Sequence, residues 1–138
     1  MGIKQNIVGR EAEKKVEELF NKNGYWALNI PKSISGQPFD FVACKGSIFE
    51  PLVDAWFIDV KHIEDKISFD FKRIEPNQRT SMKFARAHSR LKKLGFVILT
   101  EREPSRFFYL TYDKLLKLEK EGLKSVKIYE LENFEELI

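Results

Sequence analysis

The sequence has little of the residues that form disulfides and zinc sites. Its 138 residues include one cysteine, Cys44, and two histidines, His62 and His88. A single cysteine excludes an internal disulfide, and so few thiol and imidazole groups argue against a zinc site. These absences favour a reducing compartment.

Long apolar runs, internal repeats and low-complexity segments are also missing. No stretch approaches the roughly 18 apolar residues of a transmembrane helix, and the N-terminal segment lacks the apolar centre of a signal peptide. A glycine-rich phosphate loop is absent as well. We therefore expect neither a membrane span nor a signal peptide.

What is present fits one globular α/β domain spanning residues 1–138. Hydrophobic residues make up 43% of the chain and charged residues 33%, a balance typical of a globular protein. The net charge of +3 permits nucleic-acid binding without requiring it. The distribution of the charge therefore matters more than its sum.

Hydrophobic periodicity and turn residues predict alternating helices and strands. We predict a mixed, mostly antiparallel central sheet, with the N-terminal helix on one side and a long helix on another. Residues 45–54 are predicted to be an irregular connection. The predicted helices cover residues 8–22, 76–94, 112–121 and 133–138, and the predicted strands cover residues 25–30, 39–44, 55–61, 67–71, 96–100, 106–111 and 126–130.

Two acids occupy unusual positions in apolar strands. Asp40 lies between two phenylalanines, and Asp59 lies inside the strand at 55–61. A buried carboxylate is costly unless it is paired or binds a cation. Lys61 shares a strand face with Asp59, because alternate residues of a strand point the same way. Two carboxylates beside an ammonium group suit magnesium, although an isolated Asp-x-Lys is more often an ion pair or a solvated strand edge.

The first helix supplies a third candidate acid. Glu13 lies at the edge of the apolar stripe, whereas Glu11 points farther from it. From that edge the Glu13 carboxylate can reach over the sheet toward a metal ion. The alternative is an ordinary acid on the helix surface.

A helix acid, a strand Asp and an Asp-x-Lys on the next strand resemble the PD-(D/E)xK nuclease superfamily. Within it, the chain is similar to Holliday junction resolvases over roughly residues 8 to 112. Gly9 and Glu13 resemble the opening Gly-x-x-x-Glu of these enzymes, and Ser35-Gly36 resembles the Ser-Gly loop of the archaeal ones. The RecU-type pattern is matched by Phe69, Ile74, Gln78 and Met82.

The resemblance implies a restriction-endonuclease-like core, and it assigns a role to each residue of the site. Asp40 and Asp59 would bind Mg²⁺, which Mn²⁺ can replace, together with the backbone carbonyl of Val60. Lys61 would be the catalytic lysine, and Glu13 would bind the metal directly or through water. Gln78 would support the site from the start of the long helix.

The resemblance also implies a partner and a location. The protein would be a homodimer whose two sites cut opposing strands of a four-way DNA junction, in recombination and repair. It would act in the cytoplasm with the nucleoid, or in the host cytoplasm if a phage encodes it.

The sequence departs from the family pattern in three places. Phe39 rather than proline precedes Asp40, and Pro38 stands one position early. The third-strand acid is Asp59 rather than the commoner glutamate, and the connection that would match the RecU stalk is short. A restriction-like or repair endonuclease acting on duplex DNA therefore stays open, as does a DNA-binding module that keeps the fold without catalysis.

The long predicted helix carries a basic stripe, a candidate for phosphate contacts, although a solvated helix face is the alternative. Its members, at spacings of four, three and four, are Arg79, Lys83, Arg86 and Arg90, with Lys93 alongside. Phe84, Ala87, Leu91 and Leu94 form a separate, apolar face.

Other candidates lie outside that helix. Arg10, Lys32 and Ser35 are further candidate DNA contacts. His62 is expected on the strand face opposite Lys61 in a structural role, and His88 is expected in packing or at the surface.

Overall fold

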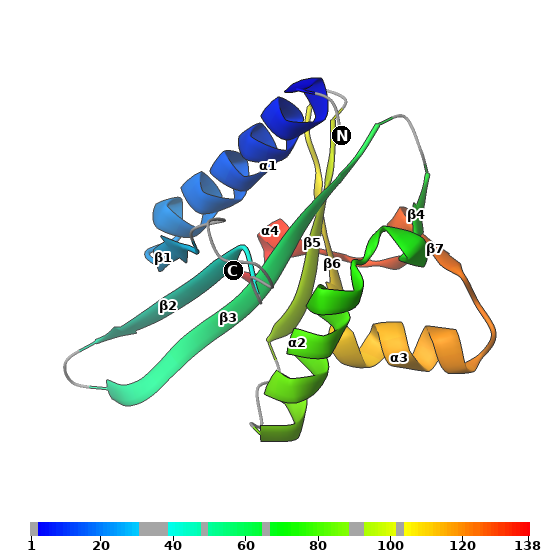
Figure 1. The fold of residues 1–138 in the computed structure, drawn as a ribbon. Coiled ribbons are helices and arrows are strands. Elements are labelled where there is room, and N and C mark those ends of the chain that lie inside the picture. The colour runs from blue at the N-terminus through cyan, green and yellow to red at the C-terminus, as the bar shows by residue number, and fades with distance from the viewer. Residues whose placement is uncertain (1–2, 31–38, 48–49, 65–66, 89–92, 102–103) are drawn as a thin grey trace.

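The computed structural model describes residues 3–30, 39–47, 50–64, 67–88, 93–101 and 104–138. Its centre is a six-stranded sheet in the order β1-β2-β3-β5-β6-β8 (Figure 1). These strands are β1 (Trp26–Asn29), β2 (Phe41–Ser47), β3 (Glu50–Ile63), β5 (Leu94–Thr100), β6 (Phe107–Thr111) and β8 (Glu132–Asn133). A two-stranded sheet pairs β4 (Ser68–Asp70) with β7 (Ser125–Lys127).

Helices cover both faces of the large sheet. On one face lie α1 (Ile3–Lys22) and α4 (Phe134–Leu137), and on the other lie α2 (Pro76–His88) and α3 (Tyr112–Lys120). Two short 3₁₀ helices, η1 (Phe71–Arg73) and η2 (Ile128–Glu130), follow β4 and β7. No helix in the described part of the chain is both long and apolar enough to cross a bilayer.

The strand directions confirm the predicted mixed, mostly antiparallel sheet. Only β3 and β5 run parallel among the neighbouring pairs of the large sheet. The connection between these two strands holds β4, η1 and α2. Because parallel neighbours need a crossover, α2 is placed against the sheet face beside β3.

Each face of the sheet has its own core. Under α1, Phe20 and Trp56 meet Phe134 in edge-to-face contacts, with ring centroids 5.2–5.4 Å apart. Under α2 and α3, buried Phe69, Met82, Phe96, Leu110 and Leu115 form the second core. The alternation of side chains along β3 therefore sends every second residue to each core.

The prediction of an irregular connection at residues 45–54 is wrong. Strands β2 and β3 extend into it as far as Ser47 and from Glu50 onward, with Cys44 opposite Ala55 and Ser47 opposite Glu50. The register shifts between Lys45 and Ser47. Cross-strand pairing, which local sequence does not reveal, outweighs the poor strand propensity of Pro51 and Asp54.

The prediction of a helix running to Leu94 is also wrong. Helix α2 ends at His88, and Leu94 begins β5. Gly95, which follows the predicted end of that helix, lies inside β5 opposite Thr111. A Cβ atom there would lie 2.3 Å from the carbonyl oxygen of Leu110, so this glycine permits close approach of β6.

The predicted apolar face of α2 is not the buried one. Met82 is buried and Ala85 packs beside it, whereas Phe84 and Ala87 are exposed. Leu91 lies outside the described residues. Helical spacing is compatible with burial of either face of α2. Contacts with the core determine which face is buried, and they cannot be inferred from the sequence of the helix alone.

Most of the remaining elements agree with expectation, but residues 128–130 of the last predicted strand are helical, and the short strand β8 was not predicted. Helix α1 begins at Ile3 rather than residue 8 and ends before Gly24, whose φ of 84° suits glycine. The strand predicted at 126–130 is the short β7 followed by η2, and the terminal helix is α4. Cys44, the one cysteine, is half-buried in β2.

Replacement of Gly95 by alanine should destabilise the protein by about 1–3 kcal/mol, because the new methyl group meets backbone rather than a movable side chain. Urea unfolding measures the change. Gly9→Ala is the control, since a Cβ atom at Gly9 meets nothing within 4 Å and helix propensity favours alanine. Equal effects of the two substitutions would contradict the close approach.

Candidate active site

Asp40 and Asp59 lie side by side at the point where β2 meets β3. Phe41 pairs with Ile58 in the antiparallel register, so the next position along places Asp40 opposite Asp59. The backbone N–H of Asp40 donates to the carbonyl of Ile58 at 3.1 Å, which continues the pairing. Both side chains are buried. Directly opposed residues share a sheet face, so the two carboxylates face the α2 side together.

The Asp40 carboxylate is fixed by the neighbouring strand. The backbone N–H of Val60 donates to its Oδ2 at 2.7 Å. The Asp40 carbonyl accepts from the N–H of Ile30 at 2.9 Å, which anchors the segment on its other side. The carboxylate is thus held against β3 rather than free to turn toward solvent.

Asp59 is the most strongly perturbed acid of the site. It is 1% exposed, and among the described residues its Oδ2 has no hydrogen-bond partner. Burial, followed by the adjacent negative charge of Asp40, raises the pKa of Asp59 to about 8. A buried carboxyl oxygen without a partner is costly, and a bound cation would remove both causes of the cost.

Lys61 lies two residues farther along the same face. Its Nζ donates to Oε1 of Gln78 at 2.8 Å. Burial lowers the pKa of Lys61, while the charges of Asp59 and Asp40 oppose that shift. The lysine therefore points toward the start of α2 and stays within electrostatic reach of the carboxylate pair.

Gln78 holds Lys61 because of its place in α2. Pro76 begins the helix, and Oε1 of Gln78 also accepts the backbone N–H of Glu75 at 3.1 Å. This is one half of a capping box, which fixes the glutamine side chain at the helix start. One amide oxygen thus joins the first turn of α2 to the lysine.

Glu13 is buried on α1, at 5% exposure. Its helix packs on the other face of the sheet, beside Phe41 and Ile58. The described part of the chain contains no group of three or more His, Cys, Asp or Glu side chains able to hold a metal ion. Glu13 is therefore not joined to Asp40 and Asp59 in one ligand set, and its role as a metal ligand stays a prediction.

The carboxylate pair nevertheless suits a divalent cation. Mg²⁺ commonly uses one or two protein carboxylates and takes its other ligands from water and phosphate. Asp40 and Asp59 are adjacent, buried and on one face, and Asp59 has an oxygen without a partner. The residues present therefore fit such an ion.

Comparison with known proteins gives a structural relative but no sequence relative. No protein-family model and no curated protein matches this sequence. The structure is similar to that of Hjc, a Holliday junction resolvase from the archaeal hyperthermophile Archaeoglobus fulgidus. The TM-score is 0.62 at 15% identity, over 94% of this chain and 98% of the other.

The chain has the fold of a Holliday junction resolvase. This confirms the predicted α/β nuclease fold. At 15% identity the likeness concerns the fold alone, so the catalytic roles of individual residues stay predictions. The geometry above is what supports them.

Within this resolvase fold, part of the basic stripe on α2 is engaged in ion pairs. The guanidinium group of Arg79 makes a bidentate ion pair with the carboxylate of Glu119 in α3, with N–O distances of 2.8 and 3.1 Å. Arg86 pairs with Asp113 at 2.6 Å. These pairs bridge α2 to α3 and offset the positive charge that the helix alone suggested.

The other predicted DNA contacts differ in their surroundings. Lys83 and Arg10 are exposed. Lys93 instead pairs with Asp54, which also accepts from Tyr25, and lies 4.7 Å from the Trp56 ring centroid. Three predicted contacts, Lys32, Ser35 and Arg90, lie outside the described residues, as do Gly36 and Pro38.

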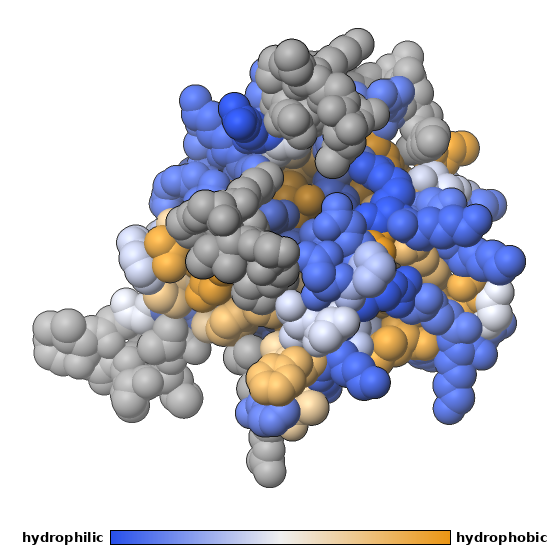
Figure 2. All heavy atoms as spheres, in the orientation of Figure 1, coloured by the Kyte–Doolittle hydropathy of each residue, from blue (hydrophilic) through white to orange (hydrophobic). Residues whose placement is uncertain are grey.

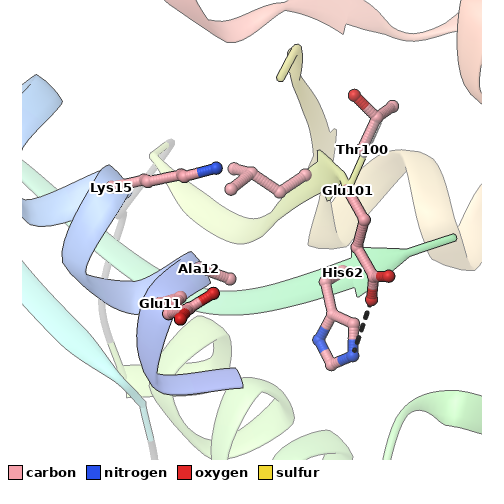
Figure 3. Close-up of a pocket in the computed structure, with 7 residues that line it drawn as sticks. Glu11, Ala12, Lys15, His62, Thr100 and Glu101 are labelled. Atoms are coloured by element: carbon pink, nitrogen blue, oxygen red, sulfur yellow. Dashed lines mark ion pairs between the residues drawn. The ribbon is translucent and has the colours of Figure 1, made fainter. Parts of the chain in front are cut away.

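His62 points away from Lys61, as expected, and lines a cavity of about 200 Å³ beneath α1. Its Nε2 lies 3.4 Å from Oε1 of Glu101 (Figure 3). Burial lowers the pKa of His62, and the nearby charge of Arg73 acts in the same direction. The other histidine, His88, is exposed and stacked on Phe84.

Two charged residues near the site were missed from sequence. Glu75 raises the pKa values of both Asp59 and Lys61, and Arg73 lowers that of Lys61. Glu75 directly precedes α2, and Arg73 ends η1. The helix start was expected at residue 76, but its place beside β3 depends on tertiary contacts that local sequence does not reveal.

The elevated pKa of Asp59 predicts a pH-dependent loss of stability in metal-free protein. A carboxyl with a folded-state pKa of about 8 and an unfolded value of about 4 stabilises the fold fully only below the lower value. That contribution declines as pH rises and is lost by about pH 8. The Asp59→Asn variant should therefore melt above the wild type, by a margin that grows from pH 5 to pH 8.

Thermal unfolding in excess chelator measures this margin. Glu136→Gln, an exposed substitution at the far end of the chain, is the matched loss of one carboxylate. It should show no such growth with pH. A constant margin for Asp59→Asn would contradict the raised pKa.

Proposed function

We propose that this protein is a metal-dependent, structure-selective DNA endonuclease that resolves four-way junctions. The observation that carries the proposal is the buried pair Asp40–Asp59 with Lys61 beside it, held by Gln78. The resolvase fold supports the same reading. DNA is the proposed partner, and a homodimer is the proposed working form.

The metal would be Mg²⁺ or Mn²⁺, held by Asp40 and Asp59. The carbonyl of Val60 and the carboxylate of Glu13 are the further candidate ligands. When bound, such an ion supplies Lewis-acid chemistry by polarising the phosphate and offsetting its charge. It would also compensate the two buried carboxylates, which explains why the fold tolerates them.

Lys61 is proposed to position the attacking water and to donate to a phosphate oxygen as negative charge develops. In the reaction, the water oxygen forms a bond to phosphorus while one phosphodiester P–O bond breaks, and the leaving oxygen takes a proton. Gln78 restricts where the ammonium group points. Orientation of this kind lowers the barrier because the lysine need not reorganise during the reaction.

Exposed basic residues are proposed to contact the DNA backbone. Lys83 and Arg10 are exposed in the structure, and Lys32, Ser35 and Arg90 remain predicted contacts. Arg79 and Arg86 would have to share their guanidinium groups with Glu119 and Asp113. Phosphate contacts carry no sequence information, so junction selectivity would come from shape.

Replacement of Asp59 by alanine should abolish cleavage, with at least about a 100-fold loss of kcat, and leave junction binding largely intact. The assay compares a synthetic four-way junction with a linear duplex of the same sequences, with and without Mg²⁺. Glu11→Ala, which removes an exposed acid of α1, is the control and should cleave normally.

The outcomes separate the alternatives. Cleavage by Asp59→Ala at the wild-type rate would contradict the proposed metal-dependent mechanism. Equal cutting of duplex and junction would favour a duplex endonuclease. Junction binding without cleavage under any divalent ion would favour a DNA-binding module.

Metal binding should release protons near neutral pH. At pH 7, Asp59 with a pKa of about 8 is mostly protonated, and a cation must displace that proton. Calorimetric titration with Mn²⁺, in buffers of different ionisation enthalpy, should detect release of about one proton per site. Asp59→Asn should release none, and release that is unchanged in this variant would contradict the assignment.

A further inference from the structure

A short helical segment carries an arginine next to the lysine of the site. Arg73 is the last residue of η1, and Ile74 and Glu75 join it to α2. The backbone N–H of Glu75 and the Nζ of Lys61 both donate to Oε1 of Gln78, at 3.1 and 2.8 Å. Two residues of chain span at most about 7 Å. The backbone of Arg73 is therefore close to Lys61, and its long side chain can reach the same space.

The electrostatic effect of Arg73 agrees with this position. Burial lowers the pKa of Lys61, and the positive charge of Arg73 adds to that shift. Burial also lowers the pKa of His62, and Arg73 is the next cause in the same direction. Lys61 and His62 point to opposite faces of β3. The guanidinium group is thus within electrostatic range of both sides of the strand end.

Hydrogen bonds and burial hold η1 in place. The N–H of Phe71 donates to the carbonyl of Lys124 at 3.0 Å. The Phe71 carbonyl accepts from the N–H of Ile74 at 3.1 Å and from the guanidinium group of Arg79 at 3.4 Å. Phe71 and Ile74 are also buried. The backbone that carries Arg73 is therefore ordered in advance, which reduces the entropy that a bound ligand would have to remove.

The side chain of Arg73 lies over a buried aromatic ring. Its guanidinium carbon is 5.8 Å from the ring centroid of Phe69, which is fully buried. A guanidinium group that stacks on a ring keeps the N–H groups at its edge for a second partner. Arg73 itself is exposed. The ring thus orients the guanidinium group and leaves it open to solvent.

Arg73 makes no ion pair with any residue that the structure describes. Burial lowers its pKa, and the charges of Glu101, Asp70 and Glu64 oppose that shift from beyond ion-pair distance. Glu101 is instead paired with His62. The N–H groups of Arg73 are therefore not occupied by a neighbouring carboxylate.

This open guanidinium group distinguishes Arg73 from two arginines of α2. Arg79 pairs with Glu119, and Arg86 pairs with Asp113. Hydrophilic side chains lie at the molecular surface where η1 leads from β4 to α2 (Figure 2). An anion that approaches this surface can contact Arg73 without displacing an acid of α3.

The charge around the carboxylate pair leaves room for another cation. Asp40, Asp59 and Glu75 are acids that act on one another or on Lys61. When all three are ionised, a divalent ion together with Lys61 would only balance their charge. Phosphate groups are held by positive charge. Arg73 would give the site the surplus that an incoming phosphodiester requires.

We propose that Arg73 binds a phosphate of the cleaved strand beside the one that is cut. This deepens the proposed nuclease function and rests on it for the identity of the ligand, a DNA phosphodiester. A planar guanidinium group can donate two parallel N–H bonds to the non-bridging oxygens of a phosphate. Arg73 would thus fix the register of the strand, while Lys61 and the metal act at the neighbouring phosphate.

Junction binding in excess chelator tests the contact without cleavage. Arg73→Gln should weaken binding by at least about 10-fold, because a charge-assisted bond to phosphate is lost. Lys72→Gln is the matched control, since it removes the same charge from the neighbouring exposed position of η1. Its effect should be clearly smaller. Arg73→Lys keeps the charge without the planar fork and should lie between Arg73→Gln and wild type.

Junctions with single methylphosphonates locate the contact, because each of these linkages lacks the charge of one phosphate. The uncharged linkage is moved along the cleaved strand through the crossover. Wild type should lose about 10-fold in affinity at a linkage next to the cut, and Arg73→Gln should lose nothing further there. Lys72→Gln should lose as much as wild type.

Steady-state cleavage separates this contact from an indirect effect on Lys61. A phosphate contact made equally in the ground state and the transition state affects KM alone. Arg73→Gln should therefore raise the KM for the junction by about 10-fold and leave kcat nearly unchanged. A displaced Lys61 would lower kcat instead.

Three results would overturn the proposal. These are equal effects of Arg73→Gln and Lys72→Gln on binding, an undiminished methylphosphonate effect in Arg73→Gln at every linkage, and a loss of kcat with unchanged KM. Thermal unfolding shows whether Arg73→Gln keeps its fold, and Arg73→Lys gives the same comparison if it does not. The binding measurements need no cleavage, so the nuclease proposal can fail while this contact holds, and the contact can fail while wild type cleaves.

Discussion

Two carboxylates that are buried next to each other are the constraint around which the neighbouring elements are arranged. Asp40 and Asp59 oppose one another across β2 and β3, and burial together with mutual repulsion raises the pKa of Asp59 to about 8. Without a bound cation, two adjacent buried carboxylates lower the stability of the fold. The surrounding elements hold them in place: the Val60 N–H fixes Asp40, and the parallel pairing of β3 with β5 fixes the backbone of Asp59.

Electrostatic cost of this kind is a common mark of a functional site. Here it coincides with a lysine on the same strand face and with the fold of a Holliday junction resolvase. The basic residues of α2 are a weaker argument, because α3 supplies acids to two of them. The carboxylate pair therefore carries more of the functional inference than the charge of the surface.

Much of this arrangement was predictable from sequence. Asp40, Asp59 and Lys61 stood out because charge is expensive in apolar strands, and strand alternation correctly placed Asp59 and Lys61 on one face and His62 on the other. Pairing between strands was not predictable in the same way: residues 45–47 and 50–54 extend β2 and β3 because the two strands bond to each other. The rotation of α2, and hence the exposure of Phe84, depends on tertiary contacts that helical spacing leaves open. The position of Glu13 was not predictable for the same reason. The helical pattern placed Glu13 at the edge of the buried face, but the sequence does not indicate how far it lies from the other acids.

The shared oxygen of Gln78 ties two events together. The same atom closes the first turn of α2 and receives the ammonium group of Lys61. Fraying of that turn would displace the acceptor of the Lys61 ammonium group, so the order of the helix start and the position of the lysine are linked. If Lys61 acts as proposed, a substitution that loosens the first turn of α2 would lower turnover by displacing the lysine, without removing a metal ligand.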